Sequence, residues 1–190
     1  LAFLGAGMQV FLLNYSVSPD RWPQALLETA AAISYLRGNA VKYGINPGKI
    51  AICGFSAGGH LAGCMANLWQ DPMFDKFLDL SAEQVRPNAA ILCYPVITMG
   101  KFGGERTRRN LFDDGPIVAQ ASLESSVTAH NPPTFLWSTV TDPSVPVENT
   151  LMYATSLREQ GVPFELHLFP KGPHAMALAT EQSAWQAEKI

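Results

Sequence analysis

Five short apolar runs, rich in β-branched and aromatic residues, are spaced along the chain. They span Val10–Tyr15, Ile50–Gly54, Ala89–Tyr94, Thr134–Ser138 and Phe164–Phe169. Several of these runs are almost continuously apolar, which is typical of strands that are buried on both faces of a parallel sheet. We therefore predict five strands, most of them parallel.

A different pattern lies between the first two runs, from Pro23 to about Tyr43. Apolar residues recur there at three- and four-residue spacing, as one face of a helix requires, at Leu26, Ala30, Ile33 and Leu36. Proline fits the first turn of a helix because the N–H that it lacks would have no partner there. We predict an amphipathic helix over this segment.

Two further helices are predicted after later strands. One spans about Ala57–Gln70, and the other spans about Val147–Gln160 and ends at Gly161, a residue type that commonly terminates helices. Strands and helices thus alternate along the chain. This alternation predicts the α/β class, with a mostly parallel sheet and helices on both faces.

Residues 99–120 interrupt the alternation. They are rich in Gly, Arg, Asn and Asp and show no clear period, which predicts a loop or lid-like excursion over one edge of the sheet. Long loops in compact domains often serve as lids or substrate-binding walls, and an inert surface loop is the alternative. With this excursion included, residues 1–190 are expected to form one domain, because the chain is too short for two sizeable cores.

Composition and charge narrow the classes of function. Hydrophobic residues make up 47% of the chain and charged residues 15%, which is typical of a globular enzyme. The net charge is −3, and the basic residues are scattered apart from Arg106, Arg108 and Arg109, so no face for nucleic acid is predicted. Each apolar run ends before the ~18 residues that a membrane span needs. We expect a soluble protein; its compartment stays open, with the cytoplasm favoured over secretion.

Three cysteines, Cys53, Cys64 and Cys93, lie inside apolar stretches. Their spacing matches neither a disulfide framework nor a metal site. We therefore predict that each is a buried small hydrophobic residue.

A candidate nucleophile follows the second predicted strand. Residues Gly54 to Gly58 match the pattern G-x-S-x-G, in which a serine, here Ser56, lies on a sharp turn between a strand and a helix. The bare pattern occurs by chance in about one chain in twenty of this length, given ordinary residue frequencies. The preceding apolar run and the following helix supply the required context. The alternative is a glycine-rich turn without chemistry.

Serine is a weak nucleophile and needs a neighbouring base that is itself oriented by a carboxylate. Asp142 follows the strand at Thr134–Ser138, at the carboxyl end where open α/β sheets place functional residues. We predict that Asp142 is the acid, with a turn or helix-cap residue as the alternative.

His174 is the predicted base. It follows the last strand in a loop that contains Gly172 and Pro173, which suits an imidazole held over the carboxyl edge of the sheet. The other histidines are less favoured: His60 turns into its helix, His130 precedes a strand and His167 lies within one. The order Ser, Asp, His is that of the G-x-S-x-G enzymes.

The negative charge that develops on a substrate carbonyl oxygen needs N–H donors already in position. The backbone N–H of Ala57, the residue after the serine at a helix N-terminus, is the predicted donor. A second donor is expected from a segment that precedes Leu1.

Several segments together resemble the acetyl-esterase and carbohydrate-acyl-esterase branch of the α/β-hydrolases, akin to hormone-sensitive-lipase-type esterases and prolyl-oligopeptidase-like hydrolases. The resemblance covers nearly the whole chain and rests on residues 10–15, 44–50, 54–62, 132–137, 145–149 and 169–174. It implies the α/β-hydrolase fold and hydrolysis of short acyl esters through an acyl-enzyme, with acetylated sugars as candidate substrates. It implies no metal and no organic cofactor.

Two positions depart from the family pattern. Thr141 precedes Asp142 where the family often has a second acidic residue, and Ser138 follows Trp137 where it often has a histidine. The first change leaves the acid in place, and the second is expected to alter the pocket wall. A related serine peptidase and an inactive binding protein of the same fold remain the alternatives.

The resemblance also implies a strand inserted between Val10–Tyr15 and Ile50–Gly54. Their axes would then stand roughly 9–10 Å apart, twice the spacing of neighbouring strands. We therefore expect about 50–90 further residues before Leu1, by analogy with the usual size of one domain. That segment would hold the missing N-terminal strand and the second oxyanion donor.

Overall fold

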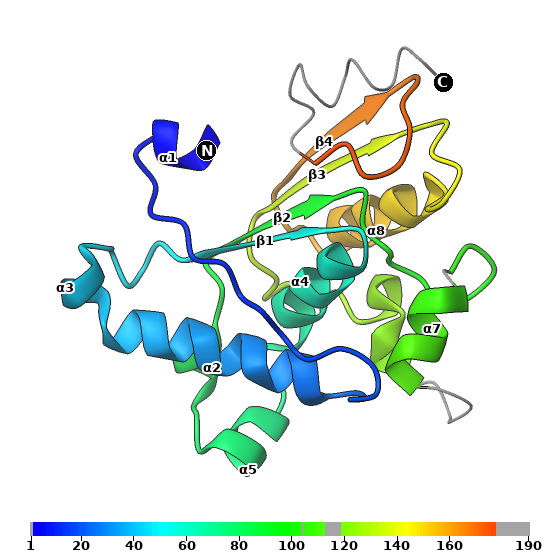
Figure 1. The fold of residues 1–190 in the computed structure, drawn as a ribbon. Coiled ribbons are helices and arrows are strands. Elements are labelled where there is room, and N and C mark those ends of the chain that lie inside the picture. Colours follow the sequence, from blue (N-terminus) through cyan, green and yellow to red (C-terminus); the bar gives the residue numbers. More distant parts are fainter. Residues whose placement is uncertain (1, 104, 113–118, 178–190) are drawn as a thin grey trace.

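The computed structural model describes residues 2–103, 105–112 and 119–177 (Figure 1). Its centre is a four-stranded parallel sheet in the order β1-β2-β3-β4. The strands are β1 (Ala51–Phe55), β2 (Ala89–Cys93), β3 (Thr134–Thr139) and β4 (Phe164–Phe169). Four of the five predicted strands are thus confirmed, each within one residue of its predicted ends.

The helices follow the strands as predicted, with shifted ends. Two predicted helices correspond to α4 (Ala57–Leu68) and α8 (Glu148–Glu159), and Gly161 adopts a left-handed φ of 70° just after α8. The helix predicted over Pro23–Tyr43 is instead two helices, α2 (Gln24–Gly38) and α3 (Ala40–Tyr43), which meet at Asn39. The remaining helices of the described residues are α1 (Ala2–Gly5), α5 (Met73–Leu78), α6 (Ala82–Val85) and α7 (Glu105–Phe112), with short 3-10 turns at Ala119–Ala121 and Leu123–Ser125.

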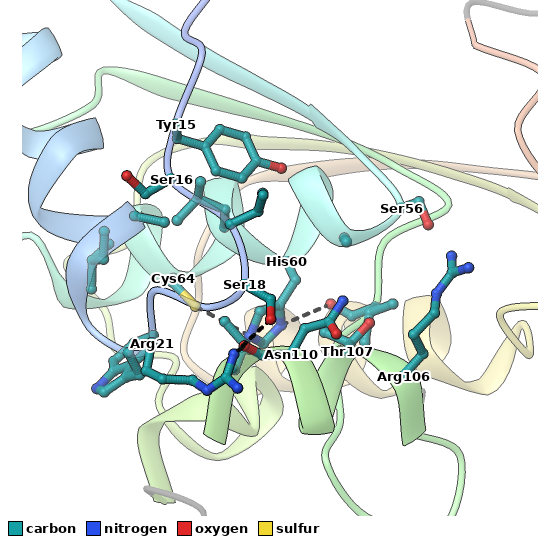
Figure 2. A pocket seen from close by; sticks show the side chains of 18 of the residues that line it. Tyr15, Ser16, Ser18, Arg21, Ser56, His60, Cys64, Arg106, Thr107 and Asn110 are labelled. Carbon is teal, nitrogen blue, oxygen red and sulfur yellow. Dashed lines mark hydrogen bonds between the residues drawn. The ribbon is translucent and has the colours of Figure 1, made fainter. Parts of the chain in front are cut away.

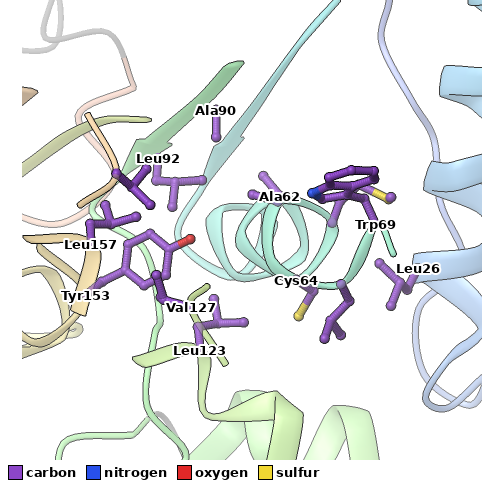
Figure 3. Close-up of a cluster of buried hydrophobic side chains, with 14 of the residues drawn as sticks. Leu26, Ala62, Cys64, Trp69, Ala90, Leu92, Leu123, Val127, Tyr153 and Leu157 are labelled. Carbon is purple, nitrogen blue, oxygen red and sulfur yellow. The ribbon is translucent and has the colours of Figure 1, made fainter. Parts of the chain in front are cut away.

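The main core lies between one face of the sheet and helices α4 and α8 (Figure 3). Leu92 of β2 and Leu136 of β3 are completely buried there, as are Tyr153 and Leu157 of α8. Helix α2 packs behind α4 and adds Leu26 to the same cluster. Burial of these apolar side chains is the main favourable contribution to the free energy of folding.

The opposite face of the sheet is covered less completely. Cys93, Tyr94 and Trp137 form a small buried cluster there, whereas Cys53 on β1 and Phe169 on β4 are exposed. Burial on both faces, expected of several strands, therefore does not hold for β1 and β4, and the prediction that Cys53 is buried is wrong. The reason is that β1 and β4 are the outer strands, and in the described residues the helices that pack on the sheet lie on the core face only.

The strand predicted at Val10–Tyr15 is not formed. This segment is irregular, and its side chains lie largely in solvent, with Leu12 96% exposed. A β-rich composition produces a strand only where a neighbour supplies backbone partners, and no described strand pairs with this segment because β1 bonds to β2 alone. The inserted strand and the separation of 9–10 Å stay predictions.

The excursion at residues 99–120 contains a helix that the sequence pattern did not reveal. Helix α7 occupies Glu105–Phe112, whereas residues 104 and 113–118 lie outside the described part. The Trp22 N–H donates to the Leu111 carbonyl at 3.1 Å, and the rings of Trp22 and Phe112 lie 6.1 Å apart. Helix α7 is thus docked on the segment that leads into α2.

Candidate active site

Ser56 occupies the turn between β1 and α4. Its backbone has φ 54° and ψ −117°, a left-handed conformation that is uncommon and costly for a residue with a side chain. The turn is held from both sides, because Ser56 N donates to the Cys93 carbonyl at 3.0 Å and Val96 N donates to the Ser56 carbonyl at 3.2 Å. Backbone bonds to the next strand therefore hold the strained turn in place.

Two glycines allow the close approach of strand and helix at this turn. A Cβ on Gly54 would lie 2.0 Å from the Gly58 carbonyl oxygen, and one on Gly59 would lie 2.9 Å from the Pro95 side chain. Gly58 itself is not crowded, since a Cβ there would meet the Tyr15 hydroxyl at 3.6 Å. A side chain is thus sterically excluded at Gly54 and Gly59. Of the two glycines in the G-x-S-x-G pattern, Gly54 is required for this reason and Gly58 is not.

The structure brings together the three side chains predicted from the sequence. Nε2 of His174 lies 2.8 Å from Ser56 Oγ, and Nδ1 lies 2.7 Å from Asp142 Oδ2. A carboxylate accepts hydrogen bonds, so Nδ1 carries the proton and the lone pair of Nε2 faces the serine hydroxyl. This is the arrangement that a general base requires.

Asp142 is fixed independently of the histidine. Its side chain is 1% exposed, and its second oxygen, Oδ1, accepts the backbone N–H groups of Ser144 at 2.8 Å and Val145 at 3.0 Å. These bonds stabilise the charged carboxylate inside the protein. They also set its orientation, so that Oδ2 points at the imidazole.

None of the other histidines approaches this arrangement. His60 is buried in α4 with Nδ1 3.1 Å from the Val96 carbonyl, and burial lowers its pKa to about 4. His130 lies in the loop before β3, and His167 is on β4 beside Glu165. The preference for His174 over these three agrees with the geometry.

A cavity of about 640 Å³ opens beside Ser56 (Figure 2). Along one wall lie Ser56, directly before α4, and His60 and Cys64, one turn apart on α4. Residues 15–18 and 20–23 form a second wall, and α7 forms a third, with Arg106 extending toward the end where Ser56 lies. His174 lines the same cavity, so the hydrogen-bonded chain is accessible from it.

The walls of this cavity are the part of the site that sequence reasoning missed. The sequence pattern places Tyr15 in a predicted strand and shows Arg106 only as part of a short basic run. The sequence carries a partial signal, because the length of the excursion at residues 99–120 is typical of a lid or a substrate-binding wall. Which of its residues face the serine depended on the docking of α7.

Ala57 begins α4 and lines the cavity next to Ser56. The N–H groups of a first helical turn have no partner within the helix and point toward its N-terminal end. This suits the oxyanion role predicted for the Ala57 N–H, which stays a prediction, as does the second donor.

Across residues 2–103, 105–112 and 119–177, no three His, Cys, Asp or Glu side chains are grouped so that they could hold a metal ion. In that part of the chain no helix has the length and hydropathy needed to cross a bilayer.

Comparison with known proteins shows the family and the fold of the chain. The family model described as BD-FAE matches residues 1–157. The chain belongs to the BD-FAE family. Its structural neighbours are α/β-hydrolases, which confirms the fold predicted from the sequence.

This BD-FAE chain is 36% identical to endo-1,4-beta-xylanase B of Butyrivibrio fibrisolvens, over 97% of the chain and 30% of that protein. It is 28% identical to an acetylxylan esterase of Xylanibacter ruminicola, over 92% of the chain and 35% of that protein. The chain thus spans about a third of the length of these relatives. A solved acetyl ester-xyloside bifunctional hydrolase from Caldicellulosiruptor lactoaceticus is 40% identical, with a TM-score of 0.80 over 93% of the chain and 66% of that structure.

Proposed function

We propose that this BD-FAE chain is the catalytic part of a serine carboxylic ester hydrolase that removes short acyl groups, acetyl above all, from carbohydrates. The observation that carries the proposal is the continuous hydrogen-bonded chain from Ser56 through His174 to Asp142. A serine aligned with a base, and a base aligned with a buried carboxylate, are what nucleophilic acyl transfer needs.

In the first half of the reaction, Ser56 Oγ attacks the ester carbonyl carbon and its proton passes to His174 Nε2. Asp142 stabilises the imidazolium that forms, because the bond from Nδ1 becomes a charge-assisted one. The Ala57 N–H stabilises the negative carbonyl oxygen. When the tetrahedral intermediate collapses, the alcohol leaves with the proton from Nε2, and the acyl group remains on Oγ.

In the second half, water takes the place of the alcohol. His174 Nε2 accepts a proton from the water as its oxygen attacks the acyl carbon, and a second tetrahedral intermediate forms. Its collapse returns that proton to Ser56 Oγ and releases the carboxylic acid. The enzyme is restored, and no step of the reaction involves oxidation or reduction.

The size and lining of the cavity favour a carbohydrate as the alcohol portion. An acetyl group fills only a small part of 640 Å³, so most of the space is available to the leaving alcohol. The walls formed by residues 15–18 and 20–23 and by α7 offer hydroxyl and amide groups at Ser16, Ser18, Thr107 and Asn110, and Trp22 lines the same cavity. Polar groups together with apolar lining residues such as Leu61 and Val96 suit a sugar ring. The xylan-related names of the relatives support the same substrate class.

The test is the release of acetate from acetylated xylo-oligosaccharides and from p-nitrophenyl acetate by the full-length protein. Labelling of Ser56 by a fluorophosphonate, followed by mass spectrometry of the modified peptide, identifies the nucleophile. Ser56→Ala should lose both activities and keep its circular dichroism spectrum, because only Oγ is removed. Acetate release by Ser56→Ala at the rate of the unmodified protein would overturn the proposal.

Two alternatives are separated by the same assays. A serine peptidase would also be labelled at Ser56 but would cleave p-nitroanilide peptides faster than acetyl esters. An inactive binding protein of this fold would show neither labelling nor acetate release.

A further inference from the structure

Tyr94 is the aromatic residue next to the candidate base, and the mechanism above gives it no role. It directly follows β2, at the carboxyl edge of the sheet where Ser56 also lies. It is 4% exposed and has a φ of 37°, in the left-handed region. Its N–H donates to the Trp137 carbonyl at 2.7 Å, so its backbone is held by the neighbouring strand β3.

The ring of Tyr94 packs directly against the imidazole. The centroids of Tyr94 and His174 lie 5.0 Å apart with the two planes at 72°, an edge-to-face contact. The Tyr94 ring is itself fixed, because Trp137 packs against it at 5.0 Å and 86°, and Phe55 lies at 6.1 Å. Side chains from β1 and β3 thus fix the Tyr94 ring that packs against the base.

The hydroxyl of Tyr94 holds the segment that carries the base. It accepts the backbone N–H of Ala177 at 3.0 Å, three residues after His174. Ala175 and Ala177 have φ of 66° and 52°, a conformation that alanine adopts at a cost. The segment therefore depends on bonds to the rest of the protein to keep this shape.

The start of the same segment has its own attachment. Thr139 Oγ1 donates to the Gly172 carbonyl at 2.9 Å, and the Gly172 N–H donates to Thr141 Oγ1 at 3.1 Å. His174 thus lies between two anchored points, one on β3 and its following loop and the other on Tyr94. Loss of either anchor frees one end of a segment whose backbone is strained.

We propose that Tyr94 is a positioning residue that aligns His174 Nε2 with Ser56 Oγ, through its ring and through its hydroxyl bond to Ala177. The proposal rests on the proposed function, since it concerns the efficiency of the same base. Tyr94 does not line the cavity beside Ser56. Its effect is therefore on proton transfer and not on substrate affinity.

The decisive variant is Tyr94→Phe, which keeps the ring and removes the bond to Ala177. Tyr153→Phe is the matched control, because Tyr153 is also buried and its hydroxyl donates to Asn67 Oδ1 at 2.6 Å, on α4 and away from the base. For each protein we would measure kcat and KM on p-nitrophenyl acetate, the rate of fluorophosphonate labelling and the melting temperature. The downfield proton resonance of the bond between His174 and Asp142 reports the alignment of the ring directly.

Tyr94→Phe should lower kcat and the labelling rate together, by about tenfold or more, because small displacements of a base have large effects on rate. KM should stay unchanged, and the downfield proton should shift or broaden. Tyr153→Phe should lose thermal stability and keep the labelling rate. Unchanged kcat, labelling rate and proton resonance in Tyr94→Phe would overturn the proposal, as would losses equal to those of the control.

Thr139→Val is a second variant that tests the proposal if Tyr94→Phe does not fold. Valine matches the shape of threonine, so this variant removes the bond from Thr139 to the Gly172 carbonyl and leaves the bond between Gly172 and Thr141. A smaller fall in kcat at constant KM is expected. Unchanged kcat there would contradict the anchoring argument. Absence of labelling in the unmodified protein would instead contradict the proposed function, so the two failures are distinguishable.

Discussion

At the scale of single residues, the candidate site depends on how each polar group is held by its neighbours. Asp142 shows this most clearly, because both of its oxygens have assigned partners. Oδ1 accepts two backbone N–H groups and Oδ2 accepts the imidazole N–H. The carboxylate is therefore already oriented before any substrate is bound.

Asp142→Asn should lower kcat by about 10⁴-fold with little change in fold, as an amide at this position favours the wrong imidazole tautomer. The variant keeps an oxygen for the backbone N–H groups, so its melting temperature should change little. Steady-state kinetics on p-nitrophenyl acetate and a thermal melt measure both quantities. Activity within tenfold of the unmodified protein would remove Asp142 from its proposed role.

The burial of His60 makes the free energy of unfolding depend on pH. Its pKa is lowered from 6.5 to about 4 because burial disfavours the charged ring. Between these values the unfolded chain binds more protons than the folded one, so the free energy of unfolding decreases as pH falls from 6.5 to 4. The loss attributable to this group is about 3 kcal/mol.

Urea unfolding at several values between pH 4 and pH 7 measures this dependence. His60→Gln should flatten the curve over that range, whereas His130→Gln, at an exposed site, should leave its slope unchanged. An identical slope for His60→Gln and the unmodified protein would show that another group dominates.

At the scale of elements, the junction of β1 and α4 sets the strictest requirement on sequence. Gly54 cannot carry a side chain because its Cβ would overlap the Gly58 carbonyl, whereas Gly58 has room. Gly54→Ala should therefore destabilise the protein by about 3 kcal/mol or more, as overpacking against a fixed backbone does. Gly58→Ala should be neutral or stabilising by up to about 1 kcal/mol, since alanine favours a helix. Denaturant unfolding of the two variants measures the contrast, and equal losses would contradict the steric argument.

Helix α7 forms a wall of the cavity on which substrate contacts are expected. Arg106 extends toward the Ser56 end, and it makes no hydrogen bond or ion pair with the described residues. Arg106→Ala should raise KM for acetylated xylo-oligosaccharides by about tenfold, the effect of losing one charged hydrogen bond to a sugar, with kcat nearly unchanged. Arg108→Ala is the control, since Arg108 is exposed on the same helix and does not line the cavity. Equal KM values for the two variants would place the substrate away from α7.

At the scale of the whole molecule, the site is assembled from the ends of all four strands. Ser56 follows β1, Tyr94 follows β2, Asp142 follows β3 and His174 follows β4. Parallel strands all point the same way, so residues that come after them meet at one edge of the sheet. Ser56 and His174 are 118 residues apart in the sequence and 2.8 Å apart in space for this reason.

Much of this arrangement was predictable from the sequence alone. The G-x-S-x-G turn, the alternation of strands and helices and the polar residues after β3 and β4 are local patterns, and they determined the fold class and the choice of Ser56, Asp142 and His174. Local patterns suffice here because periodicity and turn chemistry depend on neighbouring residues.

Only the tertiary structure decided which apolar segments pair and which surfaces meet. The run Val10–Tyr15 has the composition of a strand, yet it has no partner among the described strands and stays irregular. Helix α7 and the contact of Tyr94 with His174 likewise depend on docking between segments far apart in the sequence. Hydrogen-bond partners and packing distances at such contacts are properties of the folded chain, which is why residue patterns could not supply them.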